Sequence, residues 1–219
     1  NSAIDFIKTD YFLMLNPDCL VEENSIIFMH EIAEKYNSAA VGPWMPDDKN
    51  CYGIFPEKGK GVIRNLNQSK CTNLLENQKP SGNVCVDVHK SAVLLINKKN
   101  FKEVNMFNEK FFLFWEEIDL CRKFREKKFS IILSPEVMAS HKGSGSTKND
   151  LYTYIIRTYH HELSPLIYFK VNRFSKILYW RLFKYLFRTV SYFFILNIKK
   201  SLKNFLRFLA TLNYIFKLN

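Results

Sequence analysis

The sequence predicts an α/β fold followed by a basic amphipathic helical tail. Short apolar runs typical of buried strands, such as Tyr11–Leu15, alternate with segments of helical periodicity, such as residues 22–36. The formal net charge of +11 comes entirely from the end of the chain, because residues 163–219 contain eleven Lys and Arg but no Asp or Glu. We therefore expect an α/β part over residues 1–148 and a separate tail over residues 149–219.

The first part of the chain predicts a strand, a helix and a second strand. Residues 1–8 are typical of the end of a helix, and Tyr11–Leu15 is continuously apolar, which favours a fully buried strand. Residues 22–36 follow with helical periodicity, and residues 39–42 predict a short strand that ends at Pro43. The expected apolar face of the helix comprises Ile26, Ile27, Ala33 and Tyr36.

The middle of the chain predicts a long loop and two more strands. Residues 50–80 are polar, rich in Lys and Asn, and broken by Gly and Pro, which predicts a loop carrying one short helix. Residues 84–88 and 92–96 suit strands, and Asn97 is placed to cap a short helix that runs through Val104.

An aromatic run then leads into a charged helix. Residues 111–115 suit either a buried strand or the tight start of a helix that reaches about Lys127. Glu116, Glu117 and Asp119 occupy its first turn and bases crowd its last, which agrees with the helix macrodipole. Such acids can simply cap a helix. Beside a Phe/Trp run, however, burial raises the pKa of a carboxylate towards the range of a general base.

Two further candidates follow predicted strands. Asp18 ends an Asn-Pro-Asp segment just after Tyr11–Leu15, where α/β sheets place ligand chemistry, although Asn-Pro-Asp is also a common turn. The strand over residues 131–133 is expected to break at Pro135. His141 ends the next apolar segment and precedes Lys-Gly-Ser-Gly-Ser, so it is a candidate metal ligand or phosphate contact, or else a surface histidine.

Two segments resemble one known family. FFLFWEEIDLCRKFREKKF, followed by SPEVMASHKGSGST, resembles in order and spacing the second half of the catalytic domain in rhamnosyltransferase-like members of the inverting family 2 glycosyltransferases. YFLMLNPDCLVEEN resembles the metal and diphosphate segment of the same family, in which an LLNPD-type motif replaces the Asp-x-Asp signature. The resemblance implies a GT-A-like fold, which is an incomplete Rossmann-like mixed sheet with flanking helices.

The resemblance also implies roles for single residues. Asn16 and Asp18 would bind the diphosphate of a nucleotide-sugar donor, and Asp18 and His141 would hold Mg²⁺ or Mn²⁺. Glu117 would take the proton from an acceptor hydroxyl while the sugar is transferred with inversion. The carboxylates expected to orient the base or the acceptor are Glu116 and Asp119. The acceptor would be a polysaccharide or glycolipid precursor of the cell surface.

The chain departs from the family pattern at several positions. Relatives tend to have Ser-Gly-Ala where this chain has Lys90-Ser91-Ala92, Gly-Phe-Asp-Glu where it has Met-Phe-Asn-Glu, and an acidic pair that ends in Asp instead of Glu117. A shift of about 1 Å in a catalytic group can cost on the order of 100-fold in rate.

The family also carries nucleotide-binding units upstream of the LNPD strand. We expect residues 1–219 to be a fragment or a truncated product that is inactive by itself.

Composition argues against other classes of protein. Five cysteines without a CxxC pair indicate reduced thiols in the cytoplasm and argue against a zinc site. Residues 1–162 carry equal numbers of acids and bases and offer no extended basic face, which argues against nucleic acid as a partner.

The tail predicts amphipathic helices. From Phe174 onward apolar residues recur at helical spacing among Lys and Arg, and no uncharged apolar run reaches the roughly 20 residues of a membrane span. We expect the tail to lie on the anionic inner face of the cell membrane; alternatively, it is a helical pair packed on the catalytic part or on a partner subunit. Two functions follow: a membrane-peripheral glycosyltransferase, or a non-catalytic membrane-binding or interaction remnant of one.

Overall fold

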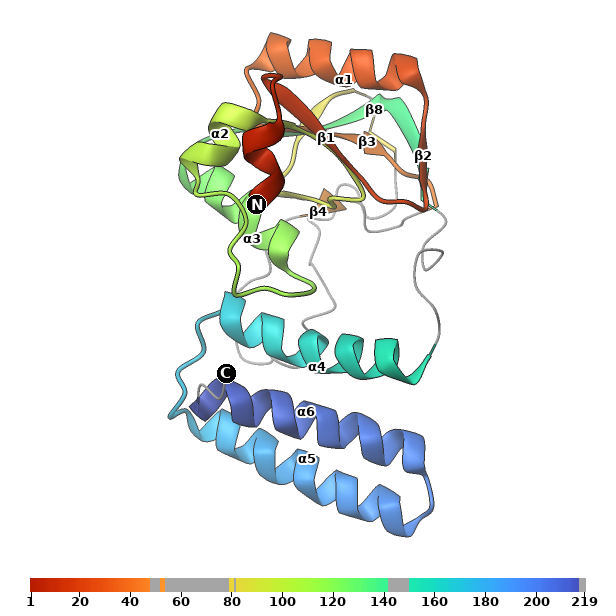
Figure 1. Ribbon diagram of the computed structural model, residues 1–219, viewed down its shortest axis with the longest axis vertical. Coiled ribbons are helices and arrows are strands. Elements are labelled where there is room, and N and C mark those ends of the chain that lie inside the picture. Colours follow the sequence, from red (N-terminus) through yellow and green to blue (C-terminus); the bar gives the residue numbers. More distant parts are fainter. Residues whose placement is uncertain (48–51, 54–78, 81, 142–149, 217–219) are drawn as a thin grey trace. The chain divides into compact units, whose positions relative to one another are not determined.

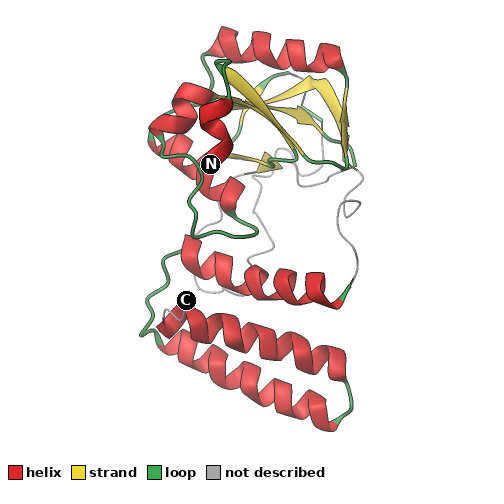
Figure 2. Ribbon diagram, in the orientation of Figure 1, coloured by secondary structure: helices red, strands yellow, loops and turns green. Residues whose placement is uncertain are grey.

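The computed structural model describes residues 1–47, 52–53, 79–80, 82–141 and 150–216 (Figure 1). These residues form a mixed α/β structure with two compact units, which we call the sheet unit and the helical unit. The sheet unit comprises Asn1–Asn108 and Glu116–Ser146, and the helical unit comprises Glu109–Trp115 and Thr147–Asn219. All described strands belong to the sheet unit (Figure 2). The roles predicted for residues 1–148 and 149–219 stay predictions.

The main sheet is mixed. Its strands lie in the order β1 (Tyr11–Leu15), β7 (Val93–Asn97), β3 (Ala40–Trp44), β8 (Ile131–His141) and β2 (Cys19–Val21), and β5 (Val84–Cys85) also pairs with β8. β3 and β8 are parallel, whereas β7 is antiparallel to both β1 and β3. β1, β3 and β8 therefore run in one direction, and their carboxyl ends lie at one edge of the sheet, which we call the carboxyl edge. The short strands β4 (Tyr52–Gly53) and β6 (Val88–His89) form a separate pair.

Helix α1 (Glu23–Tyr36) covers part of this sheet by packing on β3, β7 and β8 (Figure 1). It buries Met29, Ile32 and Ala33. The predicted apolar face was therefore partly wrong, because Ile27 and Tyr36 are exposed. β1 is a strand as predicted, but it is only partly buried, since it stands at the end of the described strand order.

Three further helices complete the sheet unit. A 3₁₀ helix, η1, spans Ser2–Phe6, and α2 spans Lys98–Glu103. The side chain of Asn97 accepts a hydrogen bond from the backbone N–H of Asn100 at 3.0 Å, which confirms the predicted cap of α2. Helix α3 spans Glu116–Glu126, close to its predicted bounds.

Two prolines that were predicted to end strands lie inside them. Pro43 belongs to β3 and Pro135 to β8. The register of this parallel pair shifts here, because Ser134 lies opposite Pro43 whereas Met138 lies opposite Trp44. Pro135 falls within the resulting bulge, where a residue without an N–H group does not interrupt the ladder.

The helical unit is built from three long helices. They are α4 (Leu151–Tyr168), α5 (Lys176–Phe194) and α6 (Ile198–Phe216), and α6 packs against both α4 and α5 (Figure 1). Pro165 lies inside α4, in its last turn, although proline usually kinks or ends a helix. None of the described helices combines the length and the apolar character that a membrane span requires.

Buried polar side chains hold these three helices together. The carboxylate of Glu162 on α4 forms an ion pair with Arg181 on α5 and accepts a hydrogen bond from the Tyr185 hydroxyl at 3.1 Å. Arg207 on α6 lies 4.0 Å from the same carboxylate. Glu162 and Arg181 are both buried, so each charge depends on its partner.

Candidate active site

The Asn-Pro-Asp segment forms the turn between β1 and β2. The backbone N–H of Cys19 donates to the carbonyl of Asn16 at 3.0 Å, which closes the turn. The backbone N–H of Asn16 donates to the carbonyl of Ala92 at 2.8 Å, just before β7 begins. These two bonds fix Asp18 at the carboxyl edge of the sheet, where ligands of α/β proteins commonly bind.

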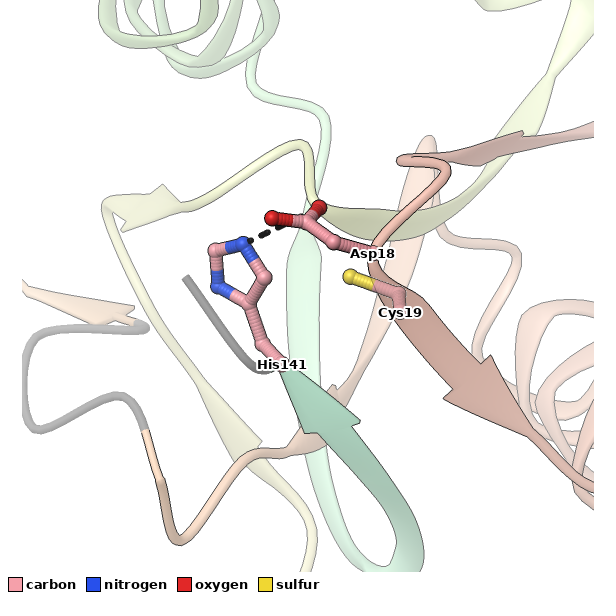
Figure 3. A group of neighbouring side chains, drawn as sticks. All are labelled: Asp18, Cys19 and His141. Carbon is pink, nitrogen blue, oxygen red and sulfur yellow. Dashed lines mark ion pairs between the residues drawn. The ribbon is translucent and has the colours of Figure 1, made fainter. Parts of the chain in front are cut away.

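Three potential metal ligands meet at this edge (Figure 3). Cys19 and His141 lie opposite each other in the antiparallel pair of β2 and β8, so their side chains share one face. Asp18 Oδ1 lies 3.6 Å from His141 Nε2, and one ligand atom from each of Asp18, Cys19 and His141 falls within 4.8 Å of the others. The side chains of Asp18 and His141 are only 8% and 17% exposed, so a bound cation would be partly shielded from water.

This donor set suits a divalent cation. The Asp18 carboxylate is a ligand for either Mg²⁺ or Mn²⁺, whereas an imidazole nitrogen such as that of His141 is a better ligand for Mn²⁺ than for Mg²⁺. The Cys19 thiol is a softer donor than either ion prefers. Cys19 is also buried within the hydrophobic core, and it was absent from the residues predicted for the site. Its position opposite His141 depends on strand register, which no local sequence pattern reveals.

The backbone turns tightly just before the acidic cluster. Phe114 and Trp115 have left-handed φ angles of 64° and 72°, so the chain turns sharply and then starts α3 at Glu116. Residues 111–115 therefore form no strand, which settles the two alternatives that the sequence left open. The turn thus sets where α3 begins, so that Glu116, Glu117 and Asp119 fall in its first turn.

The pKa values of Glu116 and Glu117 are both raised. Parts of both side chains remain accessible, but atom Oε2 of each is buried and has no hydrogen-bond partner among the described residues. The pKa of Glu117 is raised to about 7, chiefly by burial and also by the negative charge of Glu116, whereas the positive charge of Lys90 opposes both effects. Burial also raises the pKa of Glu116. A carboxylate that titrates near neutral pH is suited to accept a proton during catalysis.

Asp119 has a different environment. Its side chain is almost completely buried, and Arg122 Nη2 lies 2.5 Å from its Oδ1. Arg122 also forms an ion pair with Glu126 Oε1 at 3.0 Å, one turn further along α3. Asp119 therefore binds a base of its own helix, which suits a supporting residue better than one that contacts substrate.

One short segment connects the acidic cluster to the Asp18 group. Ala92 accepts the hydrogen bond from Asn16, while Lys90, two positions earlier, acts electrostatically on Glu117. The preceding residue, His89, is fully buried, and its carbonyl lies 3.7 Å from Cys121 Sγ on α3. The segment from His89 to Ala92 thus contacts both the Asn16 turn and α3 at the carboxyl edge. His89 was not among the residues predicted for the site, because nothing in its local sequence marks it.

Comparison with known proteins relates the chain to glycosyltransferases at a general level. No protein-family model matches it. The chain is similar to the low-salt glycan biosynthesis hexosyltransferase Agl10 of Haloferax volcanii, with 25% identity over 144 residues. The match covers 64% of this chain and 44% of that relative, so the chain spans less than half the length of the relative.

Proposed function

We propose that this chain supplies the metal-binding and general-base groups of an inverting glycosyltransferase with a GT-A-like fold, related to the rhamnosyltransferase-like members of family 2. The observation that supports the proposal is that the short segment from Lys90 to Ala92 lies beside Glu117, whose pKa is raised to about 7, and also contacts the turn of Asp18, which with Cys19 and His141 could hold a metal ion. The similarity to a hexosyltransferase supports the same class of reaction.

In the proposed reaction, Glu117 accepts the proton of an acceptor hydroxyl. The hydroxyl oxygen forms a bond to the anomeric carbon as the bond from that carbon to the nucleoside diphosphate breaks, so the configuration inverts and the electron pair leaves with the diphosphate. Mn²⁺ or Mg²⁺ held by Asp18 and His141 would offset the negative charge on the leaving group. Asn16 holds the turn that positions Asp18, and burial together with the charge of Glu116 keeps the pKa of Glu117 high.

The proposed partners follow from this chemistry. The donor is a nucleotide sugar, and the acceptor is a glycan or glycolipid precursor of the cell surface. The relative's name refers to glycan biosynthesis, which is consistent with such an acceptor. We propose that the enzyme works peripherally at the inner face of the cell membrane, because the basic helical unit suits an anionic surface.

The test uses the protein expressed from its complete reading frame, including any codons upstream of Asn1. Release of nucleoside diphosphate is measured with Mn²⁺, a panel of nucleotide sugars and membrane extracts as the source of acceptor. We expect turnover with at least one donor, with an inverted anomeric configuration in the product. Asp18→Asn and Glu117→Gln should each reduce turnover at least 100-fold. Full activity of the Glu117→Gln variant would remove Glu117 from the role of base.

A second function, a non-catalytic remnant of such an enzyme, is favoured by one observation. Lys90 stands beside Glu117 at a position where relatives tend to have a small residue. If Lys90 blocks the site, the complete protein will release no nucleoside diphosphate, and Lys90→Ser will restore donor binding. If the complete protein turns over donor with Lys90 in place, the remnant hypothesis fails.

A further inference from the structure

We infer that the outer face of α5, together with the turn between α5 and α6, is a docking surface for an anionic lipid bilayer. The biological role of this surface rests on the proposed function. The residues that form it all lie in the helical unit. The membrane contact is thereby assigned to one helix of the tail, whereas the sequence predicted it for the tail as a whole.

The outer face of α5 is a continuous apolar stripe. Its residues follow one another at intervals of three and four positions, so they lie on one side of the helix. Each of them is between 47% and 78% exposed. They are Ile177, Trp180, Phe183, Phe187, Val190 and Phe194. Aromatic side chains dominate the stripe, as they do where proteins meet the membrane–water interface.

The opposite face of α5 already has partners. Leu178, Arg181 and Tyr185 are buried. Arg181 and Tyr185 bind Glu162 of α4, which fixes the rotation of α5 about its own axis. The helix therefore cannot turn its aromatic stripe inward without breaking buried polar contacts, so the stripe stays on the outside.

The turn after α5 extends the apolar surface. Phe193, Ile195, Leu196 and Ile198 are all more than half exposed. Leu196 has a left-handed φ of 58°, which reverses the chain direction before α6 begins. An exposed apolar turn at the end of an apolar stripe makes a surface far larger than scattered single residues would, and such surfaces mark binding sites.

Helix α6 has the opposite character. Its apolar side chains Leu206, Ala210 and Ile215 are buried within the helical unit. Lys199, Lys200 and Lys203 are exposed at and near its start, close to the apolar turn. In this arrangement α6 supports α5 and contributes positive charge, while α5 supplies the apolar contact.

The charge distribution selects a membrane over a protein partner. Lys184 and Arg188 follow Trp180 at intervals of four positions, so they border the stripe, and Lys176 lies exposed near its start. No Asp or Glu occurs anywhere in residues 163–219. An apolar aromatic face that has bases along one side and no acid suits a bilayer interface, because the side chains insert among acyl chains while the bases meet anionic headgroups.

The test measures binding of the full chain to vesicles in the absence of donor and acceptor, so that it is independent of catalysis. Vesicles of phosphatidylcholine alone are compared with vesicles that also contain phosphatidylglycerol. We expect binding to the anionic vesicles that weakens with added salt, with a blue shift of Trp180 fluorescence that Trp180→Phe removes. The double variant Phe183→Asp/Phe187→Asp should bind at least tenfold more weakly.

A matched control replaces an equally exposed aromatic residue outside the stripe. Tyr152 on α4 is 72% exposed, so Tyr152→Asp adds one negative charge, as each of the two stripe substitutions does, at a similarly exposed position and should change binding less than twofold. Circular dichroism establishes that each variant is folded. Lys184→Gln/Arg188→Gln should weaken binding to anionic vesicles and flatten its salt dependence.

Two results would overturn the inference. One is equal vesicle binding by the Phe183→Asp/Phe187→Asp and Tyr152→Asp variants. The other is that the parent chain does not bind vesicles but forms dimers in light scattering, whereas the double variant is monomeric. The stripe would then contact a second copy of the chain. Failure of nucleotide-sugar turnover with intact vesicle binding would refute the proposed function and leave the docking surface standing.

Discussion

His141 Nε2 lies 3.6 Å from Asp18 Oδ1 because the antiparallel pairing of β8 with β2 brings the end of one strand beside the start of the other. The two side chains come from distant parts of the sequence, and both are largely shielded from solvent. A carboxylate and an imidazole held this way form two ligands of a divalent cation.

Mn²⁺ should stabilise the folded chain through Asp18 and His141. We expect a saturable rise in melting temperature on addition of Mn²⁺, and a smaller rise with Mg²⁺ because magnesium favours oxygen ligands. Asp18→Asn and His141→Ala should each abolish the rise. Differential scanning calorimetry over a Mn²⁺ titration measures it. Cys19→Ser is the control, since a thiol is a poor ligand for Mn²⁺, and an unchanged rise in the Asp18→Asn variant would refute the site.

Glu117 should make the stability of the protein depend on pH in an unusual direction. Its pKa is raised from 4.5 to about 7 in the folded chain, so between these values the folded state holds a proton that the unfolded state has released. The free energy of unfolding should therefore fall as pH rises from about 4.5 to about 7 and then level off. A shift of this size corresponds to about 3 kcal/mol. Urea unfolding at pH 5 and pH 8 measures it.

Glu117→Gln should remove most of this dependence, because only the smaller contribution of the raised pKa of Glu116 remains. Because glutamine has nearly the same shape and no charge, the variant should be more stable than the parent at pH 8, by about 2 kcal/mol, and similar to it at pH 5. A group that lowers stability when ionised is typical of a functional site. Equal pH profiles for the parent and the variant would show that another group carries the effect.

Gly42→Ala should destabilise the sheet unit strongly. A Cβ atom at Gly42 would lie 2.2 Å from Cε1 of His89, so the ring would have to move. The ring nitrogens of His89 lie 2.8 Å from the carbonyl of Lys90 and 3.1 Å from that of Pro43, and these contacts would be lost. We expect a loss of about 3 kcal/mol in the free energy of unfolding.

The matched control for this variant is Gly82→Ala. Among the described residues, a Cβ atom at Gly82 would meet no atom within 4 Å apart from those of its chain neighbours, so this substitution should change stability by less than about 0.5 kcal/mol. Chemical denaturation of both variants gives the comparison. Similar stabilities for the two variants would mean that His89 does not hold the position beside Gly42.

Local patterns predicted the elements of this chain better than their pairing. The strand Tyr11–Leu15 and the cap at Asn97 are set by residues adjacent in sequence, and both are present, although the strand is only partly buried. Pro135 was wrongly predicted to break the strand. β8 accommodates this proline in a bulge against β3, and β3 is far away in the sequence. The periodicity of the tail predicted its helices correctly. It could not predict which face of α5 is buried, because this depends on the ion pair of Arg181 with Glu162 on another helix.

The candidate site shows the same division. The acids beside the Phe/Trp run could be expected to have raised pKa values, because burial and a neighbouring like charge are both visible in the sequence. The approach of Cys19 to His141 and the position of His89 could not be anticipated. Both depend on strand register, which is fixed by the packing of the whole sheet.

Glu162 should be essential for the helical unit. Glu162→Gln removes the negative charge that pairs with the guanidinium of Arg181, and Arg181 itself is only 9% exposed. The substitution also weakens the hydrogen bond that the Tyr185 hydroxyl donates to residue 162. Because an uncompensated buried charge remains on Arg181, we expect the free energy of unfolding to fall by about 3 kcal/mol.

The control is Lys102→Gln, which breaks an exposed ion pair. Lys102 Nζ lies 3.1 Å from Asp5 Oδ1, and the two side chains are 47% and 78% exposed. That exposed pair should contribute less than about 1 kcal/mol. Equal losses in thermal unfolding for the two variants would show that the Glu162 cluster does not hold α4, α5 and α6 together.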